Sequence, residues 1–207
     1  MLHKQLVKVV VSVSLLCGCA SGPNLRDRSG IPGDIWSMLR AGERNDISSA
    51  LKKYCAEHSM YEYVVGDAII TAFLPRLDAE NMSPERKERI IFALEYAAKV
   101  LENARRKDDS FAEINRRLGG VYSVLADLKS DKNLYKKSAA NMERYISAGK
   151  GGSIDEIYLS LGEVYEELGQ NQKAIEAYTE YLRKHIGGSQ DSAAISARIE
   201  KLNGGKQ

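Results

Sequence analysis

The residues that could carry covalent chemistry are few, and most of them stand alone. The chain has three cysteines and three histidines. The HExxH and GxSxG patterns and paired-cysteine metal motifs do not occur in it. His58 and His185 are isolated in the sequence, and packing or a helix end accounts for each. We therefore expect no catalytic residue, no metal ligand and no cofactor, and a protein that is not an enzyme. Cys17 and Cys19 remain as candidates for chemistry.

The segment before these two cysteines is typical of an export signal. Lys4 and Lys8 precede a mainly apolar stretch, Val9–Leu16, which is too short to span a bilayer. The stretch ends in Leu16-Cys17-Gly18-Cys19, which resembles the bacterial lipobox, in which a small residue precedes the modified cysteine. We assign residues 1–18 to a lipoprotein signal peptide.

The lipobox resemblance implies that Cys19 is acylated, becomes the first residue after cleavage, and is acylated again on its amine. Cys17 fits less well, because the large Leu16 directly precedes it. The alternative is an ordinary secretory signal cut near Ala20. Each buried methylene of an acyl chain contributes about 0.8 kcal/mol, so more than one chain gives a stable membrane anchor.

The residues after Cys19 bear on location and charge. Ala20 and Ser21 follow it, with no aspartate at the second position, which by the same resemblance implies the outer membrane, facing the periplasm.

The full chain has 30 basic and 28 acidic residues. Residues 1–18 hold two lysines and no acid, so 28 of each remain after cleavage. This balance predicts no nucleic-acid partner.

Two amphipathic helices are predicted over residues 154–185, because apolar residues recur there at helical spacing. Gly169 separates them and can adopt the left-handed conformation that ends a helix. Gly162 and Ala174 are expected where the two antiparallel helices cross, with Tyr165 and Tyr178 filling the spaces beside them.

This stretch resembles a tetratricopeptide repeat, a helix–turn–helix unit. The matching residues are Tyr158, Leu161, Gly162, Tyr165, Ala174 and Tyr178. Tyr181 and Ile186 depart from the pattern, which usually has a small residue and a proline there. The resemblance implies an all-α fold in which helical hairpins stack as a short solenoid.

A second, more diverged unit is predicted over residues 112–148. Leu118, Gly119 and Tyr122 repeat the spacing of the corresponding residues in the later unit, which are Leu161, Gly162 and Tyr165. A set of residues also recurs 36 positions later: Tyr145, Gly151, Gly152, Ser153 and Asp155 match Tyr181, Gly187, Gly188, Ser189 and Asp191. Seven extra residues fall in the earlier unit, near Lys129–Lys137.

The same match predicts a final, unpaired helix over Asp191–Leu202 that solvates the last repeat. Its predicted inner residues are Ala194, Ile195, Ala197, Ile199 and Leu202, and its predicted outer residues are Arg198, Glu200 and Lys201. We assign residues 108–203 to the repeats and this capping helix.

The rest of the chain is divided more coarsely. Residues 19–33 are rich in Gly, Pro and Ser and are predicted to be a flexible tether. Residues 34–107 form an N-terminal helical region, either a degenerate repeat or a separate binding domain. Helices are predicted over 34–39, 46–58, 61–74 and 84–106, the last capped by Ser83 with Pro84 in its first turn. Ser110 and Glu113 have the spacing of a capping box.

The tetratricopeptide resemblance implies that the first helix of each pair lines a concave partner groove. By position, the exposed groove residues are Glu113, Arg116, Gly120 and Ser123 in the earlier unit, and Glu156, Leu159, Glu163, Glu166 and Glu167 in the later one. The acidic later face favours a basic or mixed peptide. The alternative is that these glutamates are a solvated helix face.

These features predict a scaffold or adaptor lipoprotein that mediates protein–protein interactions in envelope assembly, at pilus or secretin, outer-membrane or cell-wall machinery. The partner is an envelope protein or peptide, and the sequence does not specify the oligomeric state. The alternative is a lipoprotein whose residues 34–107 bind a small molecule or glycan in a pocket lined by the apolar 61–74 helix. The repeats would then serve oligomerisation.

Overall fold

The computed structural model describes residues 61–73, 82–149, 154–184 and 190–204, and every regular element in them is an α-helix. The predicted all-α fold class is confirmed for this part of the chain. The helices are α4 (Tyr61–Phe73), α5 (Pro84–Lys107), α6 (Ala112–Lys129), α7 (Lys132–Ala148), α8 (Ile154–Glu167), α9 (Asn171–Lys184) and α10 (Gln190–Gly204). The predicted signal peptide, Cys19, the tether and the helices predicted before residue 59 lie outside the described residues.

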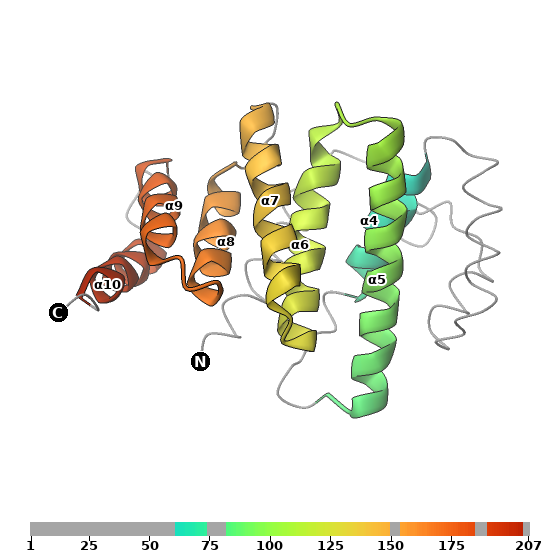
Figure 1. Ribbon diagram of the computed structural model, residues 1–207, viewed down its shortest axis with the longest axis horizontal. Coiled ribbons are helices and arrows are strands. Elements are labelled where there is room, and N and C mark those ends of the chain that lie inside the picture. The colour runs from blue at the N-terminus through green and yellow to red at the C-terminus, as the bar shows by residue number, and fades with distance from the viewer. Residues whose placement is uncertain (1–60, 74–81, 150–153, 185–189, 205–207) are drawn as a thin grey trace.

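The helices follow one another in chain order along the long axis of the molecule (Figure 1). The contacts are most extensive within three pairs, α4 with α5, α6 with α7, and α8 with α9. Smaller contacts join α5 to α6, α7 to α8 and α9 to α10, and α4 also touches α6. The described part is therefore a row of three helix pairs followed by a single helix.

The buried apolar side chains form two clusters along this row. The first joins α4, α5 and α6, and includes Ile69 and Leu101. The second is centred on α7, α8 and α9, and includes Met142 and Tyr178. Leu134, near the start of α7, packs against both clusters. Because Leu134 packs against both clusters and α6 contributes side chains to both, the α6–α7 pair links the two ends of the described helix row.

In each of the three pairs, a glycine of the first helix lies against a large side chain of the second. A Cβ atom added to Gly66 would lie 2.6 Å from Leu101 Cγ, and one added to Gly119 would lie 2.8 Å from Met142 Cγ. A Cβ atom on Gly162 would overlap the Tyr178 ring. The predicted crossing at Gly162 is confirmed. The α4–α5 pair has the same construction, although its sequence had left this open.

Two of the predicted helix ends are confirmed. The backbone N–H of Arg86 donates to Ser83 Oγ at 3.3 Å, so Ser83 caps α5. Gly169 has a left-handed backbone with φ +70°, and the next N–H, that of Gln170, donates to the Tyr165 carbonyl at 2.8 Å. This hydrogen bond satisfies a carbonyl group at the end of α8 and turns the chain into α9.

The capping box predicted before α6 is wrong. The helix begins at Ala112, after Phe111, which makes no side-chain capping bond. The Ser110 hydroxyl instead donates to the Asp108 carboxylate at 2.6 Å. Glu113 accepts hydrogen bonds from other side chains of α6 and α7. Both members of the predicted box are therefore engaged elsewhere.

The seven extra residues near Lys129–Lys137 lengthen helices and do not form a loop. Helices α6 and α7 have 18 and 17 residues, whereas α8 and α9 have 14 each. Ser130 and Asp131 alone connect α6 to α7, and Asp131 caps α7 by accepting from the Asn133 N–H at 2.8 Å. The α6–α7 pair consequently extends beyond the α8–α9 pair (Figure 1).

The inward face of α10 differs from the predicted one. Ile195 is buried and Ile199 and Leu202 are partly buried, as expected, but Ala194 and Ala197 are exposed. Arg198, expected on the outside, turns inward to acidic residues of α8. An ion pair thus decides the orientation of this helix where hydrophobicity alone favoured the alanines.

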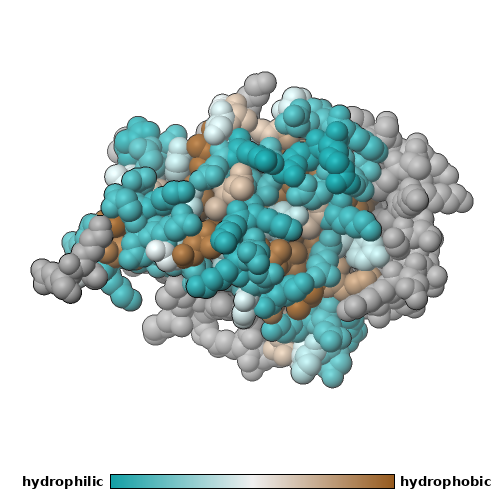
Figure 2. Space-filling model, in the orientation of Figure 1, coloured by the Kyte–Doolittle hydropathy of each residue, from teal (hydrophilic) through white to brown (hydrophobic). Residues whose placement is uncertain are grey.

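The face drawn in Figure 2 is mostly hydrophilic, and hydrophobic residues reach it only in small separate areas. Among the described residues, Phe111 is the only exposed large hydrophobic side chain, at 42%. Its ring packs edge-on against Tyr63, with 4.9 Å between the ring centroids. The described part therefore offers no broad apolar surface on this face.

Candidate functional site: the predicted partner face and its polar contacts

The predicted groove residues lie on α6 and α8, but the structure buries four of them: Arg116, Ser123, Leu159 and Glu163. The expectation that these four are exposed is wrong. Leu159 belongs to the second apolar cluster, and the two charged side chains are covered because they form ion pairs. The other groove residues reach the surface. Glu167 is exposed, and the partly exposed residues are Glu113, Gly120, Glu156 and Glu166.

The most enclosed charged contact on this face joins α8 to α10. Arg198 Nη1 lies 3.0 Å from Glu163 Oε1, and Arg198 Nε lies 3.0 Å from Glu166 Oε1. The Tyr178 hydroxyl of α9 donates to the same Glu166 oxygen at 2.6 Å, and the guanidinium stands 5.4 Å from the centroid of the Tyr178 ring. We call Glu163, Glu166 and Tyr178 the acidic socket.

Burial sets the electrostatics of this socket. It raises the pKa of the Glu163 carboxyl, and the bond to Arg198 opposes that rise. Asp127 of α6 and Glu166 add negative charge nearby and raise the Glu163 pKa further. Burial, followed by the hydrogen bond to Glu166, raises the pKa of the Tyr178 hydroxyl. A single guanidinium therefore compensates two carboxylates, one of which is buried.

A similar ion pair joins α4 to α6 at the other end of the row. Asp67 follows Gly66 as Glu163 follows Gly162, and Arg117 Nε lies 2.5 Å from Asp67 Oδ1. The Arg117 side chain is 10% exposed and that of Asp67 30%. Burial raises the pKa of Asp67, and the charge of Arg117 opposes the rise. Sequence reasoning did not find this pair, because the α4 register had not been aligned with the later units.

At the equivalent position of α6, after the packed Gly119, the residue is Gly120 and not an acid. A Cβ atom at Gly120 would have no neighbour within 4 Å. Two turns earlier, Glu113 accepts from Arg116 Nε at 2.6 Å and from the Tyr145 hydroxyl at 3.1 Å. The centre of the predicted groove is therefore an open glycine surface beside a paired acid and base.

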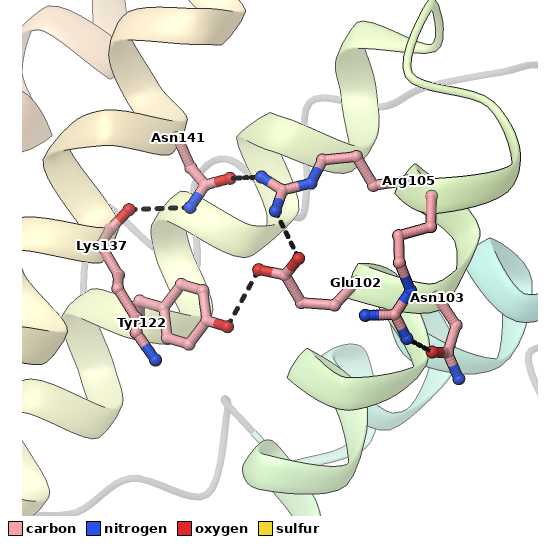
Figure 3. Close-up of polar contacts among 7 residues, drawn as sticks. Glu102, Asn103, Arg105, Tyr122, Lys137 and Asn141 are labelled. Carbon is pink, nitrogen blue, oxygen red and sulfur yellow. Dashed lines mark hydrogen bonds and ion pairs between the residues drawn. The ribbon is translucent and has the colours of Figure 1, made fainter.

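A polar network joins three helices at the first step between pairs, as Figure 3 shows. Tyr122 of α6 donates to Glu102 Oε1 of α5 at 3.1 Å, and Arg105 binds the other oxygen of this carboxylate. Arg105 also donates to Asn141 Oδ1 of α7 at 2.9 Å. Burial and the Glu102 charge raise the pKa of Tyr122 to about 12. These bonds hold α5, α6 and α7 in one arrangement.

The next step between pairs repeats part of this network. Tyr165 of α8 donates to Glu143 of α7, as Tyr122 does to Glu102. A lysine ammonium also covers each ring, with Lys137 5.3 Å from the Tyr122 centroid and Lys173 5.1 Å from the Tyr165 centroid.

The sequence did not lead to a prediction of these tyrosine–glutamate contacts, although their lysine and glutamate residues occupy similar places in the helices. Each lysine directly precedes a small residue, Ser138 or Ala174, and each glutamate directly follows a side chain that packs against a glycine, Leu101 or Met142. The repeat pattern itself consists of apolar, glycine and turn positions and does not include these charged neighbours.

Within the described ranges, no group of three or more His, Cys, Asp or Glu residues is placed to hold a metal ion. In the same part of the chain, no helix combines the length and the apolar character needed to cross a membrane. The chain matches no protein-family model, no curated protein and no solved structure.

Proposed function

We propose that the protein is a scaffold lipoprotein, anchored at Cys19 in the outer membrane and facing the periplasm, that holds partners during envelope assembly. The observation that supports a scaffold most directly is the repeated construction of the helix pairs. In each pair a glycine accommodates a large side chain: Leu101 against Gly66, Met142 against Gly119 and Tyr178 against Gly162.

In this proposal α4–α5, α6–α7 and α8–α9 are three tetratricopeptide-like units of a short solenoid, and α10 covers the last one. Residues 61–107 then belong to a repeat. Successive units are joined by the tyrosine–glutamate bonds of Tyr122 and Tyr165. A row of units joined in this way presents an extended surface to partners without catalytic groups.

The alternative function, ligand binding by the N-terminal region, depended on the apolar surface of α4. That surface packs against α5 and α6, with Val65, Ile69 and Phe73 buried. Core packing accounts for these side chains, so we retain the scaffold proposal. In a thermal-shift screen against cell-wall fragments and lipids, a scaffold should give no response.

The anchor is tested by replacing Cys19. The Cys19→Ala protein should move from the membrane fraction to the soluble periplasm, while the Cys17→Ala protein should stay in the membrane and lose its signal peptide normally. A Cys19→Ala protein that remains membrane-bound would show that the anchor proposal is wrong.

The partner face is tested by site-specific photo-crosslinking of the intact lipoprotein in cells. A crosslinking side chain at Gly120 lies on the open centre of the groove, whereas one at the exposed Lys136 of α7 serves as a control for other surface. We expect discrete crosslinked species from position 120 and not from position 136. Equal products from both positions would exclude the groove as the partner surface.

A further inference from the structure

The acidic socket on α8 and α9 requires a cation. Glu163 is 6% exposed, and its carboxylate and that of Glu166 converge on one guanidinium. A buried carboxylate without a counter-charge is strongly unfavourable, so a surface of this kind does not stay uncovered. Whatever covers it must bring a positive charge and apolar side chains beside that charge.

Only one face of helix α10 is covered, and this face carries the contact with the socket. Ile195 is buried, Ile199 and Leu202 are partly buried, and Arg198 is the charged contact. The opposite face of α10 is exposed, at Ala193, Ala194, Ser196, Ala197 and Glu200. By contrast, α6, which brings Arg117 to Asp67, also packs against both α5 and α7. The arginine-bearing helix is thus enclosed at one end of the row and peripheral at the other.

We propose that the acidic socket is an exchangeable docking site for an amphipathic partner helix with one arginine between aliphatic residues, and that α10 is its resident occupant. This inference rests on the scaffold function proposed above and specifies the partner chemistry of the same face. The recognised pattern is that of α10, with aliphatic residues at positions equivalent to Ile195, Ile199 and Leu202 around the arginine. The charge of the socket excludes helices with an acid at the arginine position.

The covalent link between α9 and α10 sets the condition for exchange. Residues 185–189 connect α10 to α9, and so short a covalent connection gives α10 a high effective concentration at the socket. A partner helix must bind strongly enough to displace the covalently linked α10. The intact chain therefore favours partners that also contact the groove beyond the socket. The C-terminal helix would then select for partners that engage two places at once.

The first test asks whether α10 can leave without unfolding the socket. Arg198→Glu in the full-length protein places a third acid beside Glu163 and Glu166. Hydrogen exchange should lose protection in α10 and keep it in α8 and α9. The matched control is Arg183→Glu, which reverses an exposed ion pair with Glu180 on α9 and should leave α10 protected. Loss of protection in α8 and α9 together with α10 would overturn the proposal, since α10 would then be an integral part of that fold.

The second test uses a fluorescent peptide with the sequence of residues 190–204 and measures its anisotropy. It should bind full-length Arg198→Glu at least ~10-fold more tightly than the wild-type protein, whose socket is occupied in cis. A peptide that keeps only the three aliphatic residues and the arginine at their spacing should bind equally well. The same peptide with arginine moved to another face should not bind. Equal binding of all peptides, or none to Arg198→Glu, would overturn the docking site.

These outcomes separate the inference from the scaffold function. If α10 cannot be displaced from the socket but position 120 still crosslinks to a partner, the scaffold proposal stands and α10 is a fixed cap. If the socket exchanges and Cys19→Ala remains membrane-bound, the docking site stands and the anchor is wrong.

Discussion

The two ends of the helix row use the same contact in different settings. In both, the acid that follows a packed glycine pairs with an arginine from a later helix: Asp67 with Arg117, and Glu163 with Arg198. The Arg117 pair lies at the α4–α6 contact, and α6 is held by α5 and α7 as well. Arg198 belongs to the last helix, which packs on α9 and reaches α8 through this arginine.

The difference shows that the role of an ion pair depends on what else holds its helices. Breaking the first pair leaves a buried charge inside a packed region, because α6 cannot move away. Breaking the second leaves α10 free to separate and lets water reach the glutamates. The first contact should therefore contribute to global stability, and the second to the attachment of one element.

The largest effect should come from Arg117→Ala. It removes a counter-ion that is only 10% exposed, and we expect a loss of about 2–3 kcal/mol in the free energy of unfolding, below the usual cost of a fully buried pair because Asp67 is partly exposed. Urea unfolding followed by circular dichroism measures this loss. Arg198→Ala should shift the same transition much less. Equal shifts for both variants would contradict the distinction between the two ends.

The next effect compares the glycines at the two ends. Gly162→Ala forces a methyl group into the Tyr178 ring, which its hydrogen bond to Glu166 holds in place, so we expect a loss of ~1–3 kcal/mol. Gly66→Ala meets the flexible end of Leu101, which can turn aside, and should cost less. Thermal unfolding of both variants provides the comparison. A larger loss at Gly66 would show that the first pair is packed more rigidly than its contacts suggest.

The sequence predicted the helices and their crossing points because apolar spacing and glycine placement are local signals. The Leu-Gly-x-x-Tyr spacing shared with the later unit predicted that Gly119 lies where its helix pair crosses, and the structure puts Met142 of α7 there. The sequence could not show that the extra residues near Lys129 lengthen helices, since a polar, lysine-rich stretch is compatible with either a loop or an exposed helix.

The candidate face was harder to predict, because its burial depends on contacts between distant helices. Glu163 was expected to be exposed by its position in the resembled repeat, yet it is buried and paired with Arg198, which was predicted to lie on the outer side of its helix. The Tyr122–Glu102 and Tyr165–Glu143 hydrogen bonds likewise join different helices, and local sequence patterns do not predict such contacts. A search for polar positions at the repeat spacing would have found the tyrosine–glutamate joints but not the arginines, which stand at different positions in their helices.

The pH dependence should have the same sign at both ends and be larger at the socket. The folded protein holds the pKa of Glu163 above its ordinary value of 4.5, so the folded state takes up a proton more readily than the unfolded state. The stabilisation from that proton is complete below the unfolded pKa and is lost as the pH rises through the folded pKa.

Lowering the pH from 7 toward 4.5 should therefore stabilise the wild type relative to Glu163→Gln, which cannot titrate. Asp67→Asn should give a smaller difference of the same sign, because the Asp67 side chain is more exposed. Unfolding free energies measured across this range give both slopes. A wild type that loses stability relative to Glu163→Gln on acidification would mean that pairing with Arg198 outweighs burial.

The smallest effect should come from Gly120, which follows the packed Gly119 at the position where α4 has Asp67 and α8 has Glu163. A Cβ atom there meets nothing within 4 Å, and alanine is favoured over glycine inside a helix, so Gly120→Ala should stabilise the protein by about 0.5–1 kcal/mol. Gly119→Ala, one residue earlier, is the matched control and should not stabilise, because its methyl group meets Met142. If Gly120→Ala is stabilising and also weakens photo-crosslinking from a probe placed at the exposed Glu167 of α8, then stability is not what keeps the glycine there. A surface left open at that cost would be used by the partner, whereas unchanged crosslinking would place partner contacts nearer the ends of the row.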